Sequence, residues 1–151
     1  MRIYVCSPYA AKNDLGIWTN VEAAKEYCRA IFEEGHDSCA PHLFYPQFCD
    51  DKNPDERARC MEAAKRELLL CDGVMVFGDE LSSGMKEELD LSIQHEIPVY
   101  EASKNDLERH VRNAVQFFET KKRLLESEWK QQSKTNRRQN LNDPRGRTDC
   151  E

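Results

Sequence analysis

The 151-residue chain is 39% hydrophobic and 33% charged, with a formal net charge of −6. This length and composition predict one globular domain with a sizeable core and exclude an intrinsically disordered chain. Residues 119–151 hold nine Lys/Arg and six Asp/Glu, or +3, whereas the remainder holds 13 and 22, or −9, so nucleic acid is not expected as a partner of this acidic body.

The sequence has no signal-peptide pattern and no long apolar span, so we expect a cytoplasmic protein without a membrane partner. Its seven cysteines are odd in number and form no C-x-x-C pair, which predicts reduced thiols, several of them packed as small core residues. His36, Cys39 and His42 are ligand-like in type, but no second cluster accompanies them, and we expect no metal.

Residues 3–6 form an apolar run that predicts the first strand, and Pro8 prevents this strand from continuing. Ser7, Pro8 and Tyr9 therefore form a loop at the carboxyl end of the strand, where they either face a ligand or make a plain turn. The sequence has no G-x-G-x-x-G, so the dinucleotide-binding fingerprint is absent and we expect no cofactor.

The first helix is predicted from a capping box with Thr19 as the cap and Glu22 as the third residue, and Gly35 is predicted to end it. A short strand follows at residues 37–40. Residues 41–48 are aromatic and bracketed by prolines, which argues against regular helix or central strand and predicts a loop with three rings. These rings either stack on a ligand or cap the core.

Asn53 and Pro54 are predicted to begin the next helix, as its cap and first residue, and the helix is expected to run to about Cys71. Residues 73–77 form an uninterrupted apolar run, which is typical of a parallel strand buried on both faces. Asp72 starts this strand at the end opposite the expected ligand crevice, so we interpret it as structural.

The turn after this central strand opens another helix. Ser82 and Ser83 supply capping oxygens, and the predicted core face comprises Met85, Leu89 and Ile93. Glu87 and Glu88 lie in the opening turns, where the helix macrodipole alone favours acidic residues. In an open α/β sheet, however, such a turn lies at the carboxyl end of a strand, where ligands bind.

Residues 97–100 form a short strand, and Pro98 indicates a sheet edge or a strand start. Ser103 is predicted to cap a last helix. The apolar stripe of this helix is longer than the other elements need, which predicts a homo-oligomer; it comprises Leu107, Val111, Val115, Phe118, Leu125 and Trp129. From Gln131 onward the chain is polar, so we expect a domain at residues 1–130 and a flexible tail at residues 131–151.

The order of these elements predicts a single-domain α/β fold, with a flavodoxin-like or Rossmann-like parallel sheet and helices on both faces. Residues 1–100 resemble the nucleoside 2-deoxyribosyltransferase-like superfamily, and more narrowly a small, mostly uncharacterised bacterial and phage branch similar to DUF4406 and DUF7768. The matching pieces are residues 3–9, Gly35-His36, residues 40–43, residues 45–48, Cys71-Asp72, residues 76–78, Ser83-Gly84-Met85-x-x-Glu88 and residues 97–99.

This resemblance implies a nucleophile. In characterised relatives the glutamate of the S-G-x-x-x-E pattern attacks the anomeric carbon of the sugar, and Glu88 stands at that position. Those enzymes also carry an aspartate eight residues before the aspartate that opens the central strand, and here Ala64 stands there, so that catalytic aspartate is absent. Ser82 matches the serine that holds the phosphate in deoxynucleoside 5′-phosphate N-hydrolases, and a helix N-terminus suits a phosphate independently.

The expected partner is a small-molecule nucleoside or nucleotide. The residues expected to bind it are Ser7, Pro8, Tyr9, His42, Asp79, Ser82, Ser83 and Gly84. Three functions remain open: an enzyme that cleaves an N-glycosidic bond through Glu88, a protein that binds or sequesters a nucleotide without turnover, and a structural or interaction protein on a decayed fold. For the enzyme, the acid that protonates the leaving base is Tyr9, Asp79 or Glu80.

Overall fold

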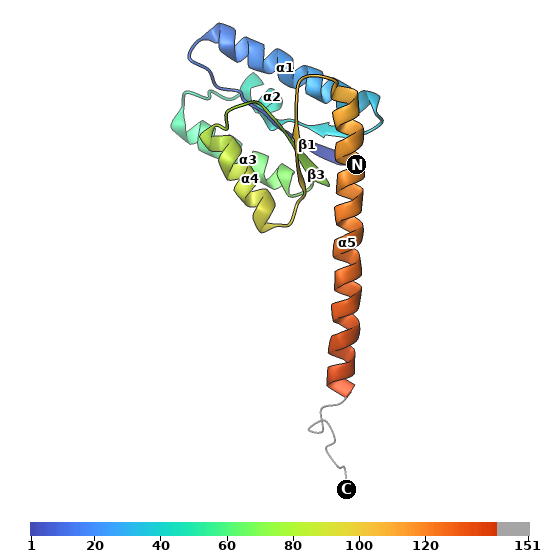
Figure 1. Cartoon of the computed structure of the whole chain (residues 1–151). Coiled ribbons are helices and arrows are strands. Elements are labelled where there is room, and N and C mark those ends of the chain that lie inside the picture. Colours follow the sequence, from blue (N-terminus) through green and yellow to red (C-terminus); the bar gives the residue numbers. More distant parts are fainter. Residues whose placement is uncertain (142–151) are drawn as a thin grey trace. The chain divides into compact units, whose positions relative to one another are not determined.

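The computed structural model of the protein describes the backbone of residues 1–141 and the side chains of residues 1–135. The chain divides into two compact units, Met1–Phe118 and Glu119–Glu151. The first unit contains a four-stranded parallel sheet in the order β2-β1-β3-β4 (Figure 1). Its strands are β1 (Arg2–Cys6), β2 (Asp37–Cys39), β3 (Gly73–Phe77) and β4 (Val99–Ala102). The predicted α/β fold and flavodoxin-like strand order are therefore confirmed.

Helices join the strands. Helix α1 (Asp14–Glu33) connects β1 to β2, α3 (Pro54–Leu68) precedes β3, and α4 (Ser83–Gln94) connects β3 to β4. Between β2 and α3 lie the short helix α2 (Pro41–Phe44) and the 3₁₀ turn η1 (Tyr45–Gln47). The long helix α5 (Leu107–Leu141) follows β4. Among the residues that the structure describes, no helix is both long and apolar enough to cross a membrane.

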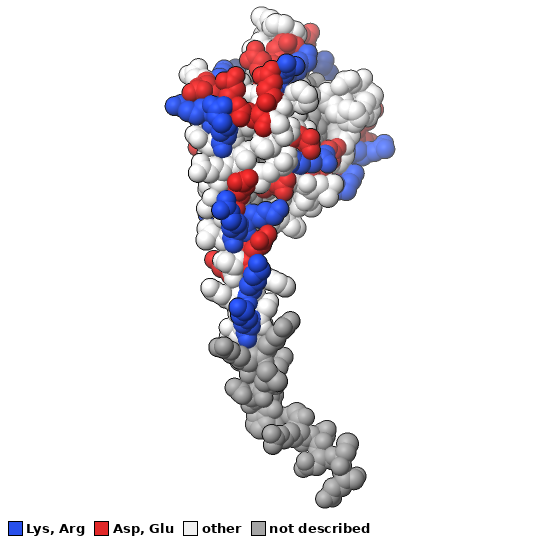
Figure 2. Space-filling model, turned by 90° about the vertical axis from the view of Figure 1, so that its right-hand side faces the viewer, with Lys and Arg blue, Asp and Glu red and all other residues white. Residues whose placement is uncertain are grey.

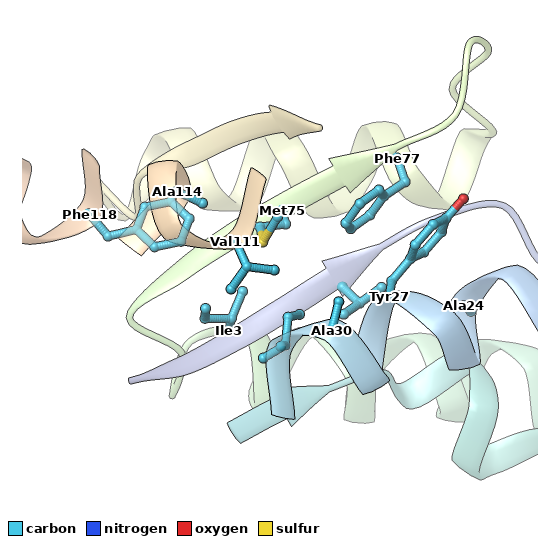
Figure 3. Packing of buried hydrophobic residues seen from close by; sticks show 11 residues of the cluster. Ile3, Ala24, Tyr27, Ala30, Met75, Phe77, Val111, Ala114 and Phe118 are labelled. Atoms are coloured by element: carbon cyan, nitrogen blue, oxygen red, sulfur yellow. The ribbon is translucent and has the colours of Figure 1, made fainter. Parts of the chain in front are cut away.

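One face of the sheet packs against α1 and the beginning of α5. Ile3, Val5, Met75 and Phe77 point from the strands toward this side. The Tyr27 ring of α1 stacks on Phe77 with a centroid distance of 3.8 Å, and Phe118 of α5 is fully buried (Figure 3). Gly73 leaves room for that ring, because a Cβ at Gly73 would lie 2.6 Å from Phe118.

The other face packs against α3 and α4, because alternate residues of a strand point to opposite sides. Tyr4 and Cys6 of β1 lie on this side with Val74 and Val76 of β3. They pack against a smaller group from the helices and neighbouring loops, which includes Leu68, Cys71 and Met85. Every residue of β3 is buried, as the uninterrupted apolar run predicted.

Several local predictions are confirmed. Asn53 caps α3, accepting hydrogen bonds from the backbone N–H groups of Asp55 and Glu56, and Pro54 is the first helical residue. Gly35 follows α1 with φ at +81°, and the next N–H, of His36, returns to the Ile31 carbonyl, which is a glycine-terminated helix end. Asp72 accepts a hydrogen bond of 2.8 Å from the backbone N–H of Arg2.

The predicted start of the first helix is wrong. Helix α1 begins at Asp14, and the Asn13 side chain caps it by accepting from the Gly16 N–H. Thr19 lies inside the helix, where its hydroxyl donates to the Leu15 carbonyl. Thr19 and Glu22 match the capping-box pattern, but the backbone was already helical upstream, and the pattern alone cannot report that.

The core face of α4 is also corrected. Met85 is buried and Leu89 packs against the core, but Ile93 is 71% exposed, and the neighbouring Ser92 is fully buried. The Ser92 hydroxyl tolerates this burial because it donates to the Glu88 carbonyl at 2.8 Å.

Two further boundaries differ from the prediction. Residues 41–47 form α2 and η1 rather than an irregular loop, because Pro41 and Pro46 lie near helix starts, where a missing N–H is tolerated. Helix α5 begins at Leu107 rather than after Ser103, and it extends to Leu141, so helical backbone continues past Gln131, where we expected the tail. Residues 142–151 of the expected tail lie outside the described residues.

Candidate functional site

A pocket of about 120 Å³ lies where the loops after three strands meet. Ser7 and Tyr9 follow β1, Pro41 and His42 follow β2, and Ser82 and Gly84 follow β3. This is the position at which parallel α/β sheets bind ligands, because the carboxyl ends of the strands share one edge. Helix α3 completes the wall.

The structure brings most of the predicted site residues together. Among those predictions, the residues that line the pocket are Ser7, Tyr9, His42, Ser82, Gly84 and Glu88. Pro8, Asp79 and Ser83 do not line it. Pro8 packs toward Gly78, where an added Cβ would lie 3.0 Å from the proline ring. Asp79 and Ser83 are exposed, and so is Glu80, one of the predicted proton donors.

Glu88 points into the protein rather than to solvent. Its Oε1 accepts a hydrogen bond of 2.8 Å from the hydroxyl of Tyr4, which is fully buried. Burial raises the pKa of Glu88, and hydrogen bonds from Tyr4 and Cys6 oppose this shift. The neighbouring Glu87 is exposed and pairs with Lys65 at 3.0 Å. The helix macrodipole therefore suffices to explain Glu87, whereas Glu88 is partly buried and is held by hydrogen-bond donors from the sheet.

The donors to Glu88 stay protonated. Burial and the adjacent Glu88 carboxylate raise the pKa of the Tyr4 phenol and of the Cys6 thiol far above neutrality. Both residues come from β1, and they hold the carboxylate from the sheet side. The predictions missed them because they were assigned only to the core. Their alternation with Ile3 and Val5 places them on the α4 side of the sheet, which is a usable signal.

Ser7 and His42 form a second polar unit in the wall. The Ser7 hydroxyl and His42 Nε2 share a hydrogen bond of 2.9 Å, and Ser7 is only 6% exposed. Burial lowers the pKa of His42 to about 4, so the imidazole is neutral near pH 7. His36 and Cys39 do not join it, since His36 lies against the N-terminal amine and Cys39 against Arg2 and Glu67. The described residues contain no cluster of three or more such side chains that could hold a metal ion.

The N-terminus of α4 opens on the pocket. The Ser82 hydroxyl caps the helix by accepting from the Met85 N–H at 3.3 Å. Gly84 lies against Met61 of α3, because a Cβ at Gly84 would be 3.3 Å from the Met61 methyl carbon. The glycine therefore lets α3 and α4 approach closely beside the pocket.

Helix α3 supplies a set of pocket residues, of which the sequence analysis singled out only Ala64, as the position of the absent aspartate. Arg57, Cys60, Met61 and Ala64 line the pocket from this helix, and Arg57 pairs with Asp51 at 2.9 Å. These α3 residues recur at helical spacing, which is a signal for a shared face, although the pattern does not say what that face meets. Ala64, at the position of the absent aspartate, is 5% exposed.

The aromatic segment contributes only one ring. Phe44, Tyr45 and Phe48 contact one another edge to face, with centroids 5.2–5.9 Å apart. Tyr45 lines the pocket, whereas Phe44 and Phe48 are 56% and 63% exposed. The alternative that these rings cap the core is therefore wrong for Phe44 and Phe48.

Comparison with known proteins supports this fold. A solved structure of the 2-deoxyribosyltransferase from the psychrotolerant bacterium Bacillus psychrosaccharolyticus matches with a TM-score of 0.54 and 18% identity, covering 70% of this chain and 74% of that chain. At this identity the likeness shows the fold. None of the curated proteins compared with the chain matches it. The model of a family described as a domain of unknown function matches residues 1–102, and the chain therefore belongs to that family, DUF7768.

Proposed function

We propose that the protein cleaves the N-glycosidic bond of a nucleoside or nucleotide, with Glu88 as the nucleophile. The carboxylate attacks the anomeric carbon and the base departs, which forms a glycosyl ester on Glu88. Water or a second base then resolves this ester. The likeness to a 2-deoxyribosyltransferase supports the reaction class, and the position of the Glu88 carboxylate in the pocket supports the assignment of the nucleophile.

The observation that carries this proposal is the hydrogen bond of 2.8 Å between Tyr4 and Glu88. A buried phenol that donates to a carboxylate fixes its orientation, and a fixed nucleophile needs no reorganisation during attack. Partial burial also removes water from the carboxylate, which strengthens its interaction with a developing positive charge on the sugar.

The remaining pocket residues suit the other parts of such a ligand. The N-terminus of α4, where Ser82 and Gly84 line the pocket, favours a sugar hydroxyl or a 5′-phosphate. Ser7 and His42 offer neutral hydrogen-bonding groups, and Tyr9 and Tyr45 offer rings for the base. Acidic and basic side chains are intermixed on the face shown in Figure 2, so this face does not present the uniformly basic surface that favours nucleic acid.

A second candidate function is binding without turnover. Ala64 favours it, because this residue lines the pocket as a methyl group at the position where the resembling enzymes carry an aspartate. A pocket that holds a nucleotide but does not deliver a proton to its base would retain the ligand intact.

We also propose that the protein is a homo-oligomer. Leu124, Leu125 and Trp129 of α5 are exposed, and Trp129 is 69% exposed. Exposed large apolar residues that recur along one helix are typical of a surface that meets another protein.

One experiment separates the enzyme from the binder. The full chain is incubated with a panel of nucleosides and 5′-nucleotides, and free base is measured by chromatography. Release of base supports the enzyme, and thermal stabilisation by a nucleotide without release supports the binder. Glu88→Gln keeps the shape but removes the nucleophile, so release should fall by several powers of ten. Turnover that survives this substitution would falsify the assigned mechanism.

A further inference from the structure

Cleavage of a neutral nucleoside needs a proton donor at the base, because the departing nitrogen otherwise leaves with a negative charge. Among the described residues that line the pocket, only Glu88 and Asp51 have carboxyl groups. Glu88 must be ionised to attack. The carboxylate of Asp51 pairs with the Arg57 guanidinium at 2.9 Å, so it already serves as a hydrogen-bond acceptor in the pocket wall.

The other acidic groups of the pocket are weak. Burial and the charge of Asp51 raise the pKa of Tyr9, and burial with the adjacent Cys49 raises the pKa of Cys60 to about 11. His42 is neutral near pH 7, since burial lowers its pKa to about 4. The Tyr45 hydroxyl donates to Glu67 rather than into the pocket. The wall is therefore able to orient a base but poorly suited to protonate one.

The same wall is suited to a positive charge. Glu88 and Asp51 contribute two negative charges and Arg57 one positive charge, which leaves the lining with a net negative charge. The tyrosine rings at positions 9 and 45 add faces on which a cation binds favourably. A cationic heterocycle is thus favoured over a neutral one in this pocket.

We propose that the site acts on N-glycosides whose leaving heterocycle already carries a positive charge, such as N-alkylpurinium and pyridinium nucleosides. This inference rests on the proposed function and names its substrate class. The Glu88 carboxylate forms a bond to the anomeric carbon while the C–N bond breaks, and the electron pair of that bond neutralises the ring. Water then attacks the glycosyl ester, its oxygen becomes the anomeric hydroxyl, and one proton is released to solvent as the carboxylate is regenerated.

The test compares substrates that differ by one methyl group. The full chain is given guanosine or 7-methylguanosine, and in parallel 2′-deoxyguanosine or 7-methyl-2′-deoxyguanosine, at neutral pH, and released base is measured by chromatography. A sample without protein corrects for spontaneous loss from the methylated compounds. Nicotinamide riboside tests the pyridinium arm. We expect at least 100-fold faster release from a methylated nucleoside than from its neutral parent, which is about the contribution of a proton donor.

Ala64→Asp provides the reciprocal test, because it adds a carboxyl group to the pocket wall. In this variant the preference for the methylated nucleoside should shrink at least tenfold, through faster release from the neutral parent. A melting curve shows whether the variant folds. If it does not fold, the rates of release from methylated and neutral nucleosides by the natural protein still test the substrate class. Glu88→Gln should abolish release from every substrate.

The outcomes separate the two claims. Equal rates for methylated and neutral nucleosides would leave the proposed function intact and overturn the substrate class. Release from cationic substrates alone supports both. The absence of release from all five compounds would overturn the N-glycosidic reaction itself, and the substrate class with it.

Discussion

The hydroxyl of Tyr4 and the carboxylate of Glu88 are 84 positions apart in the sequence and 2.8 Å apart in the structure. This hydrogen bond joins β1, the first strand, to α4, the helix that follows β3. Because it connects the buried sheet to the candidate nucleophile, this hydrogen bond contributes both to the stability of the fold and to the environment of the Glu88 carboxylate.

Tyr4→Phe should lower the stability of the fold and change the pH dependence of base release. Loss of a buried hydrogen bond to a charged group should lower the free energy of unfolding by about 1.5–3 kcal/mol. It also removes a group that holds down the pKa of Glu88, so that pKa should rise further, and the acid limb of the pH–rate profile should move to higher pH. Denaturant unfolding and base release at several pH values measure the two effects.

The matched control is Tyr100→Phe. Tyr100 also bonds through its hydroxyl, to His110 at 3.3 Å, but it does not line the pocket. This control should leave the pH–rate profile unchanged. A shift of the same size in both variants would show that Tyr4 does not act through Glu88.

The contact between Gly73 and Phe118 makes β3 sensitive to a single added methyl group. Gly73→Ala would place a Cβ 2.6 Å from the Phe118 ring, and overpacking of this kind typically lowers stability by about 1–3 kcal/mol. Combining Gly73→Ala with Phe118→Leu should cost less than the two single effects added together. Additive effects in a double-mutant cycle would contradict the contact.

Stability should fall as the pH decreases from about 6.5 to 4. The pKa of His42 is about 4 in the folded chain and near 6.5 when unfolded, so in this window the unfolded state takes up a proton that the folded state does not. The loss should approach roughly 2–3 kcal/mol at pH 4. It is read from urea unfolding at a series of pH values.

His42→Asn should flatten that pH dependence, because asparagine does not titrate. His95→Asn is the control, since His95 is exposed at the end of α4. If both variants keep the slope of the natural protein, the loss of stability comes from other groups.

Truncation after Lys130 should leave the melting temperature of the Met1–Phe118 unit nearly unchanged, because the core residues Val111, Ala114 and Phe118 all precede it. Calorimetry measures this, and a large decrease would show that the removed residues stabilise the fold.

The proposed homo-oligomer is tested through the exposed apolar residues of α5. Light scattering of the natural chain at micromolar concentration should give at least a dimer, and Trp129→Glu should reduce the mass. A monomer mass for the natural chain would reject the proposal.

The sequence by itself determined the strands, the longer helices and their order, although not the short helical turns at residues 41–47. Apolar runs such as residues 73–77, the Asn53-Pro54 helix start and the Gly35 helix end depend on local backbone preferences, and these act within a few residues. The alternation of helices and strands then left few topologies, because parallel crossovers are right-handed. The pocket residues Ser7, His42, Ser82 and Glu88 were predictable because they lie at the carboxyl ends of strands or match a motif.

Only the tertiary structure decided which side chains meet. Arg57, Cys60 and Ala64 enter the pocket because α3 packs beside α4, and no local pattern reports that contact. Ser92 rather than Ile93 faces the core, because it lies on the side of α4 that packs against the rest of the fold, and its hydroxyl tolerates burial by donating to the Glu88 carbonyl. The pairing of Tyr4 with Glu88 depends on the stacking of a helix on a sheet, which is a property of the whole fold rather than of either segment.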